Sequence, residues 1–455
     1  MLSIGLMSGT SMDGIDAALI ETDGEHQIAE LGDISCDYDA DFGILLKSAE
    51  YAVRQLSGNL PAAKAFYQQA IEHYLQNELG VIDTDVSTKV NQLSLYFHGD
   101  NEKPITFDQV VQRSTELHAD IVSKLLKKTH RSPDEIDVIG YHGQTLLHRP
   151  SAKITVQVGD GALLAKITGI TVVNDFRRRD VFSGGQGAPF APLYHQALAI
   201  RDHKIPTAVV NCGGIANVTV ITGKGLTDVV GFDTGPGNGL IDRYIKQRTH
   251  GKESMDRNAK YGSSGRVNEE TIKLLYEKSI TSHSGDFFRS KPPKSLDIAD
   301  FSLIPELNIL SIQDACATLE AFTADAIVHS TEFFDGVIPT YWILAGGGWN
   351  NPVIRRELDI RLKEKLGSQI EVMTADEVGW NSRALEAQIF AYLAVRSLMN
   401  LPISVPGTTL VPKPLCGGHA HLPQNGTTPE VAKWLKQNPD ILSGYFNKKS
   451  SNLFL

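Results

Sequence analysis

The chain is poor in cysteine, has no basic surplus and contains no long apolar run, and each absence excludes a class of protein. Its four cysteines form no CxxC pair, which argues against a disulfide framework and against a zinc knuckle. A formal net charge of -10 argues against a nucleic acid or an anionic membrane bound through a general basic surface. Because no secretory leader or membrane-spanning run is found, we expect a reduced, cytoplasmic protein without a membrane partner.

Two common nucleotide-binding fingerprints are also missing. No GxxxxGK[ST] sequence occurs, and no GxGxxG follows a predicted strand. The length of 455 residues and the hydrophobic share of 42% are nevertheless ordinary for a globular protein with two or three domains and substantial cores. Any polyphosphate must therefore be bound locally, by a different arrangement of glycines.

Glycine-rich turns of another kind follow several predicted strands. They occupy residues 7–14, 211–217, 232–238 and 345–352. Residues without a Cβ let the main chain turn sharply and offer its N–H donors to phosphate oxygens at close range. Together these turns predict a nucleotide site, although a polar hairpin turn explains residues 9–14 about equally well when that segment is taken alone.

Hydrophobic patterning predicts two strand-rich halves. In the first half the predicted strands are 3–7, 15–21, 136–140, 154–158 and 170–173, and the predicted helices are 42–79 and 110–128. In the second half we predict strands at 207–211, 217–222, 228–232 and 341–345, helices that begin after Ser311, after Asn351 and after Asn381 or Ser382, and a short helix at 429–437. The repeated pattern indicates an internal duplication, with a linker near residues 200–206.

A charged segment at residues 174–189 follows one of these strands. It crowds two carboxylates, three guanidinium groups and a glycine-rich bend into one stretch. Nearby arginines favour the ionised form of a carboxylate, so either Asp175 or Asp180 can serve as a general base. The competing interpretation is a solvated charged loop, which the flanking glycines and proline disfavour.

Polar residues also follow the strand predicted at 136–140, at a strand end where α/β folds bind ligands. The candidate sugar contacts are His142, Gln144, Thr145, Arg149 and Gln186. A turn without any ligand explains residues 141–149 equally well. Neither His142 with His148 nor Cys416 with His419 and His421 has the ligand set of a zinc site, and we predict a plain loop around the latter group.

Six motifs together resemble one known family. They are MSGTSMDGID at 7–16, GYHGQTLLHRP at 140–150, NDFRRRDVFSGGQGAP at 174–189, NCGGIANVT at 211–219, GFDTGPGN at 231–238 and AGGGWNNP at 345–352. In this order and combination the sequence resembles the 1,6-anhydro-N-acetylmuramic acid kinases, from residue 3 to about residue 410. Residues 419–455 match no pattern of that family.

The resemblance implies a fold and its division into domains. The family belongs to the actin, Hsp70 and sugar-kinase superfamily, in which two α/β lobes each contain a mixed five-stranded sheet flanked by helices, with ATP in the interlobe cleft. We expect an N-terminal lobe at residues 1–203, rejoined by part of 382–455, with the first phosphate loop, the sugar site and the catalytic base. A C-terminal lobe at 204–381 would supply the second phosphate loop and the adenosine pocket.

The resemblance also implies roles for individual residues. The implied nucleotide contacts are Gly9, Thr10, Ser11, Met12, Asp13, Gly14, Ile15, Asp16, Asn211, Gly213, Gly214, Asn217, Asp233, Gly235, Gly237, Asn238, Gly346, Gly347, Gly348 and Asn350. Asp180 matches the catalytic aspartate of the family. Met7 stands where the superfamily usually has an aspartate, so Asp13 becomes the candidate to hold Mg²⁺, through water.

The implied reaction opens the internal anhydro bond of the amino sugar with water and phosphorylates its O6. It consumes ATP with Mg²⁺ and yields N-acetylmuramic acid 6-phosphate and ADP during peptidoglycan recycling. The resemblance further implies a homodimer. Two alternatives stay open on the residues alone: a simple sugar kinase that uses Asp180 as base, and a nucleotide-driven conformational protein, which would need no polar sugar pocket.

Overall fold

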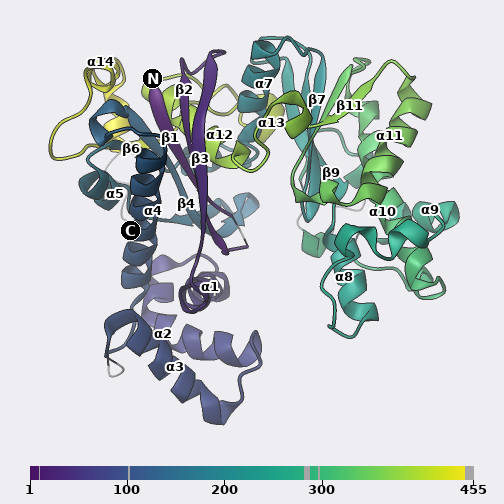
Figure 1. Cartoon of the computed structure of the whole chain (residues 1–455), viewed down its shortest axis with the longest axis horizontal. Coiled ribbons are helices and arrows are strands. Elements are labelled where there is room, and N and C mark those ends of the chain that lie inside the picture. The colour runs from purple at the N-terminus through teal and green to yellow at the C-terminus, as the bar shows by residue number, and fades with distance from the viewer. Residues whose placement is uncertain (10, 101–102, 281–286, 296–297, 446–455) are drawn as a thin grey trace. The chain divides into compact units, whose positions relative to one another are not determined.

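The structure is a computed structural model of the chain, and it describes residues 1–9, 11–100, 103–280, 287–295 and 298–445 (Figure 1). The chain forms two compact α/β units. Unit 1 comprises Met1–Tyr194, Ala384–Pro406 and Leu410–Leu455, and unit 2 comprises His195–Arg383 and Gly407–Thr409. Two helices contain boundaries between these ranges, α7 (Ala191–Arg201) and α13 (Pro406–Thr409).

Unit 1 is built on a mixed sheet with seven strands among the described residues. They are β1 (Leu2–Ser8), β2 (Gly14–Thr22), β3 (Ile28–Asp37), β4 (Val138–Arg149), β5 (Ile154–Val158), β6 (Thr171–Asn174) and β12 (His419–His421). The order is β12-β6-β4-β1-β2-β3, and β5 pairs with β4. The implied five-stranded sheet is therefore extended by β5 and by β12, so the loop predicted around His419 and His421 is wrong at this short strand.

Helices flank this sheet. They are α1 (Ala40–Gln55), α2 (Leu60–Asn77), α3 (Asp83–His98), α4 (Phe107–Lys128), α5 (Gly161–Thr168), α6 (Arg178–Phe182), α12 (Leu385–Leu398) and α14 (Pro429–Gln437). The single helix predicted at 42–79 is divided in two, because Ser57 and Gly58 both adopt positive φ and Asn59 then caps α2 through the N–H of Ala62.

Helix α12 packs directly on the sheet of unit 1 (Figure 1). A Cβ on Gly5 of β1 would lie 1.8 Å from the carbonyl oxygen of Ala387, and a Cβ on Gly140 of β4 would lie 2.0 Å from that of Phe390. Only glycine permits this approach. The helix begins later than predicted, because Ala384 rather than Asn381 or Ser382 occupies the N-cap.

Unit 2 contains a second mixed sheet, with five strands among the described residues. They are β7 (Thr207–Cys212), β8 (Ile215–Ile221), β9 (Val229–Pro236), β10 (Tyr341–Ala345) and β11 (Glu371–Thr374). The order β11-β10-β7-β8-β9 and the strand directions repeat those of β6-β4-β1-β2-β3 in unit 1. The predicted duplication is confirmed at the level of strand topology.

The helices of unit 2 are α8 (Gly239–Arg248), α9 (Glu269–Lys278), α10 (Ile312–His329) and α11 (Pro352–Leu366). The caps predicted for α10 and α11 are present: the side chain of Ser311 accepts from the N–H of Asp314, and Asn351 Oδ1 accepts from the N–H groups of Val353 and Ile354. Across the described parts of both units, no helix is both long and apolar enough to cross a membrane.

Candidate active site

The first glycine turn joins β1 to β2, and a buried glutamine of β4 holds it. Ser8 Oγ donates to Gln144 Oε1 at 2.6 Å, and Gln144 Nε2 donates to the carbonyl oxygen of Gly9 at 2.9 Å. The side chain of Gln144 is completely buried, so its amide orders the turn from beneath. Thr10 lies outside the described residues.

Acidic side chains surround this turn. Asp13 is exposed and accepts from Ser11 Oγ at 2.7 Å. Asp16 lies opposite Met7 in the β1–β2 register. Burial raises the pKa of Asp16, and the negative charge of Asp13 and of other nearby aspartates raises it further, against a hydrogen bond from Ser35 that lowers it. The carboxyl group of Asp16 is therefore close to other negative charges, including the exposed carboxylate of Asp13.

Asp180 lies in α6, and the glycine-rich bend encloses its carboxylate. Only 1% of Asp180 is exposed. Asp180 Oδ1 accepts from the N–H of Gly187 at 2.6 Å, and a Cβ on Gly185 would lie 2.1 Å from the same oxygen. The bend can therefore close around the carboxylate only because residue 185 is glycine, and the segment is not the solvated loop of the competing interpretation.

The arginines beside Asp180 have different partners. Arg177 Nε donates to His142 Nε2 at 2.9 Å, and Arg177 Nη1 donates to the carbonyl oxygen of Gly187 at 2.7 Å. Burial, and then the charge of Arg177, lowers the pKa of His142 well below its usual range. Arg178 forms an ion pair with Asp175. The carboxylate of Asp175 is thus bound to a guanidinium group.

The remaining sugar candidates lie within or beside β4, which extends through Arg149 instead of ending at residue 140 as predicted. His148 contacts Thr155 Oγ1 through Nδ1 and the carbonyl oxygen of Gln186 through Nε2, both at 2.9 Å. Burial lowers the pKa of His148 to about 4, so the ring is neutral at pH 7. Thr145 is half-buried, whereas Arg149 is exposed at the end of the strand.

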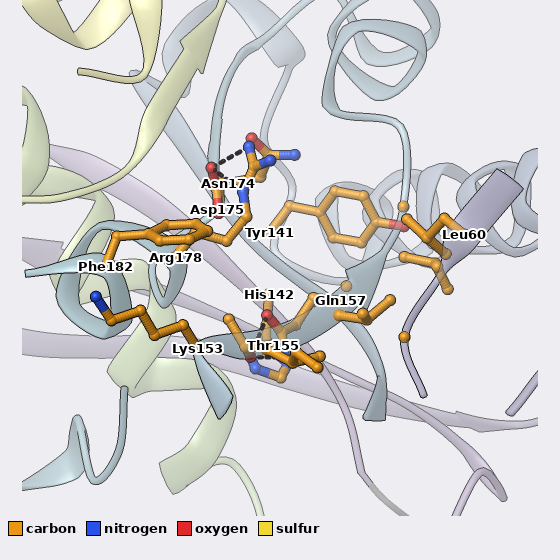
Figure 2. Close-up of a pocket in the computed structure, with 16 residues that line it drawn as sticks. Leu60, Tyr141, His142, Lys153, Thr155, Gln157, Asn174, Asp175, Arg178 and Phe182 are labelled. Carbon is orange, nitrogen blue, oxygen red and sulfur yellow. Dashed lines mark hydrogen bonds and ion pairs between the residues drawn. The ribbon is translucent and has the colours of Figure 1, made fainter. Parts of the chain in front are cut away.

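A cavity of about 170 Å³, lined by both polar and apolar side chains, adjoins these residues inside unit 1 (Figure 2). Residues of β4, β5, α6 and the end of β6 supply most of its wall, including Tyr141, His142, Lys153, Thr155, Gln157, Asn174, Asp175, Arg178 and Phe182. Figure 2 shows the ion pair of Arg178 with Asp175, and the hydrogen bonds between Thr155 and Gln157 form a separate polar patch. The sequence did not indicate Lys153 or Gln157. Gln157 lies in β5 and Lys153 directly precedes it, and only the pairing of β5 with β4 brings this segment to the cavity.

In unit 2, the turns after β7 and β9 bind each other through their main chains. The N–H of Gly237 donates to the carbonyl oxygen of Gly214 at 2.9 Å, and the N–H of Asn238 donates to that of Gly213 at 2.7 Å. A Cβ on Gly237 would lie 2.2 Å from the carbonyl oxygen of Gly213. These two predicted phosphate turns are therefore brought together by close main-chain contact.

The glycine turn after β10 packs on the end of β7. A Cβ on Gly346 would lie 2.5 Å from Asn211 Oδ1, and one on Gly348 would lie 2.4 Å from Cys212 Sγ. By contrast, no heavy atom lies within 4 Å of the position a Cβ would take on Gly214 or Gly347. The turns thus have a packed side and an open side, where main chain faces solvent.

The other predicted residues of unit 2 surround these turns. Asn217 and Asp233 are opposite each other in the β8–β9 register, and both are half-buried. Gly235 is buried, with Ala326 3.1 Å from the position of a Cβ. Asn350 is exposed. The start of α11 is not an open donor site, because its own N-cap takes the first N–H groups.

Comparison with known proteins places this arrangement in a family. The family model for anhydro-N-acetylmuramic acid kinase matches residues 88–420. The anhydro-N-acetylmuramic acid kinase of Methylobacterium nodulans is 39% identical over 419 residues, covering 92% of this chain and 99% of that protein. That of Rhodospirillum rubrum is 39% identical over 416 residues, covering 91% of this chain and 93% of that protein. The chain belongs to the anhydro-N-acetylmuramic acid kinase family.

Membership in the anhydro-N-acetylmuramic acid kinase family makes the chain an anhydro-sugar kinase of cell-wall recycling. A kinase of this family draws its phosphoryl group from ATP. Among solved structures, a ROK family glucokinase from Streptomyces griseus in complex with glucose and AMPPNP aligns with a TM-score of 0.35 and 12% identity, covering 87% of this chain and 99% of that one.

Proposed function

We propose that the chain opens 1,6-anhydro-N-acetylmuramic acid with water and phosphorylates O6, giving N-acetylmuramic acid 6-phosphate and ADP. The family assignment supports the substrate and the phosphoryl transfer. One observation supports a general base in this site: a buried aspartate carboxylate, Asp180, is oriented by a main-chain N–H and enclosed by a glycine bend. The hydrolytic half of the reaction is supported by the family assignment. A kinase that only adds phosphate needs a base for a hydroxyl, whereas this one needs a base for water.

Asp180 is the proposed base. It takes a proton from a water molecule as the water oxygen bonds to C1 of the sugar. The bond from C1 to the bridging O6 breaks, and O6 bonds to the γ-phosphorus of ATP as the bond from that phosphorus to the leaving oxygen of ADP breaks. The N–H of Gly187, 2.6 Å from Asp180 Oδ1, keeps the carboxylate in one orientation during this transfer.

We assign the nucleotide to the glycine turns. In unit 2 the open main chain at Gly214 and Gly347 suits the approach of phosphate or adenosine groups. In unit 1 the turn at residues 9–16 supplies main-chain donors. Asp13 fits Mg²⁺, because its exposed carboxylate can bind the ion through water, as Mg²⁺ commonly binds when substrate phosphates complete its shell. When bound, Mg²⁺ neutralises charge on the transferred phosphoryl group.

For the sugar we keep the contacts assigned from the sequence and add the cavity of unit 1. Of those contacts, His142 is in the cavity wall, and His148 links β4 to Gln186 in the bend around Asp180. A volume of about 170 Å³ is below the roughly 300 Å³ of a small ligand pocket. The cavity therefore suits one substituent of the sugar. A cytoplasmic homodimer, which the cysteine content and the resemblance support, completes the proposal.

The substitution Asp180→Asn tests this assignment. Asparagine can still accept the hydrogen bond from Gly187, so we expect a folded protein that binds ATP but loses about two to four orders of magnitude in sugar-dependent ADP release. Asp137→Asn is the matched control, because the carboxylate of Asp137 also accepts from a main-chain N–H, that of Leu2, but precedes β4 at the opposite end of the strand. Near-normal turnover in Asp180→Asn would remove Asp180 from the mechanism.

A further inference from the structure

One buried face of helix α10 contacts two of the glycine turns of unit 2. Glu320 and Thr323 are three residues apart and so lie on the same side of the helix. Their exposed fractions are 0% and 1%. Each makes a hydrogen bond outside its own helix: Thr323 bonds to the glycine turn after β9, and Glu320 bonds to the glycine turn after β10.

Thr323 holds the turn that follows β9. Its Oγ1 donates to the carbonyl oxygen of Gly237 at 3.0 Å, in a buried position. The N–H of the same Gly237 donates to Gly214. Gly237 is therefore held by two hydrogen bonds, one from α10 to its carbonyl oxygen and one from its N–H to the neighbouring turn. Together they fix the orientation of the peptide groups in this turn.

Glu320 holds the turn that follows β10 through an asparagine. Glu320 Oε1 accepts from Asn351 Nδ2 at 2.6 Å. The other end of that amide, Asn351 Oδ1, caps α11, and the N–H of Asn351 donates to the carbonyl oxygen of Gly348 at 3.0 Å. An acceptor beside Nδ2 prevents the amide from rotating by half a turn, which would place its donor against the helix N–H groups.

The carboxyl group of Glu320 is itself held in a tight place. A Cβ on Gly262 would lie 1.8 Å from Glu320 Oε2, so a side chain at residue 262 would require the carboxyl group to move. Burial raises the pKa of Glu320 to about 8, and the charge of Asp256 adds to that effect against the hydrogen bond from Asn351. A neutral carboxyl at pH 7 can still accept from Asn351, so the hydrogen bond does not depend on ionisation.

We propose that Glu320 and Thr323 are positioning residues for the nucleotide, because one face of α10 sets the orientation of the glycine turns that follow β9 and β10. Neither residue is proposed to touch the substrate. The inference rests on the proposed function, in which these turns receive ATP. It adds two buried polar residues that the nucleotide-binding motifs do not include.

Four variants of the full chain test it. Thr323→Val and Glu320→Ala remove one anchor each, and we expect Mg-ATP binding to weaken by about 5–10-fold, the effect of one lost hydrogen bond, while KM for the sugar changes less than twofold. Thr323→Ser and Glu320→Gln keep the hydroxyl and the acceptor, so they should bind Mg-ATP within about twofold of the parent chain. Calorimetric titration of each variant with Mg-ATP gives these values directly.

Ser330→Ala is the matched control. Ser330 follows α10, is buried and donates to the carbonyl oxygen of Ile327 at 2.6 Å, away from both turns. It should lower the melting temperature without weakening Mg-ATP binding. The proposal is overturned if Thr323→Val binds Mg-ATP as Ser330→Ala does, or if Glu320→Gln fails as badly as Glu320→Ala. A parent chain that binds Mg-ATP but shows no sugar-dependent ADP release would refute the proposed function and leave this inference standing.

Discussion

The two units repeat one strand topology but place different chemical groups at the ends of corresponding strands. In unit 1, β1 and β4 end at polar side chains, and Gln144 supports the first glycine turn with its amide. In unit 2, β7 and β10 end at turns that contact each other through glycine main chain, with Cys212 between them. The same scaffold thus presents side-chain chemistry in one copy and main-chain donors in the other.

The glycines themselves differ between the copies. A Cβ on Gly9 in unit 1 would meet Ser11 Oγ at 3.4 Å, an ordinary contact, whereas one on Gly237 in unit 2 would lie 2.2 Å from a carbonyl oxygen. Gly9 therefore has space for a methyl group, and Gly237 has none. Glycines in similar motifs therefore differ in whether the structure requires a residue without a Cβ.

The largest effect should come from Gly237→Ala. The added methyl group must displace the main chain at Gly213, so we expect a loss of about 1–3 kcal/mol in the free energy of unfolding and the loss of measurable Mg-ATP binding. Gly9→Ala should unfold within about 0.5 kcal/mol of the parent chain. Urea titration and Mg-ATP calorimetry of the two variants check this contrast, and equal losses of stability in both would break it.

A second contrast between the units concerns how their stability depends on pH. Burial lowers the pKa of His118, His148 and His421 in unit 1 to about 4, whereas in unit 2 it lowers that of His195 to about 4 and raises that of Glu320 to about 8. The buried histidines stay neutral when folded but gain a proton below about pH 6.5 when unfolded. The contribution of these histidines to the free energy of unfolding is present above pH 6.5 and is lost as the pH falls toward 4. That of Glu320 is present below pH 4.5 and is lost as the pH rises through 8.

Unit 1 should therefore be the acid-sensitive unit. Between pH 7 and pH 5 we expect unit 1 to lose about 1–2 kcal/mol for the completely buried His118 and less for each of the half-buried His148 and His421, and we expect a smaller net change in unit 2. Hydrogen exchange resolved by peptide, corrected for the intrinsic rate, measures opening in each unit at both pH values. If unit 2 lost more protection than unit 1, the assignment of buried neutral histidines would be wrong.

The smallest effect should come from a change at α14, a helix of unit 1 that has no counterpart among the described residues of unit 2. Thr428 caps α14 through the N–H of Val431 and donates to Asp137 Oδ1 at 2.6 Å, beside the start of β4. Thr428→Ala should cost about 1 kcal/mol and lower the melting temperature by about 2–4 °C, with unchanged turnover. Differential scanning calorimetry measures the shift, and an altered kcat would show that this segment does more than stabilise unit 1.

Prediction from the sequence succeeded where local signals were strong. Strong periodicity and side-chain caps predicted β5, β10, α11 and α14 closely. Prediction from the sequence failed where contacts with other segments determine the secondary structure. Strand β3 and helix α3 have weak local patterns and were missed, and the polar residues after Gly140 continue β4 because β5 pairs alongside them. A single sequence shows no such partner.

The same limit applies to the site. Asp180 and the glycine turns could be proposed from motifs, because the residues of each motif lie in one short segment. The cavity residues Lys153 and Gln157, and the anchors Glu320 and Thr323, could not, since only folding brings them to the turns and to the cavity. Each looks like an ordinary strand or helix residue in the sequence.

The most direct test of the account is to incubate the protein with Mg-ATP and 1,6-anhydro-N-acetylmuramic acid in ¹⁸O-water and to analyse the sugar product by mass spectrometry. If one event couples hydrolysis to phosphorylation, the product carries one ¹⁸O at C1 and an unlabelled phosphate at O6, and one ADP forms for each sugar opened. A product whose anhydro ring is intact, or ADP release that does not depend on the sugar, would contradict the account.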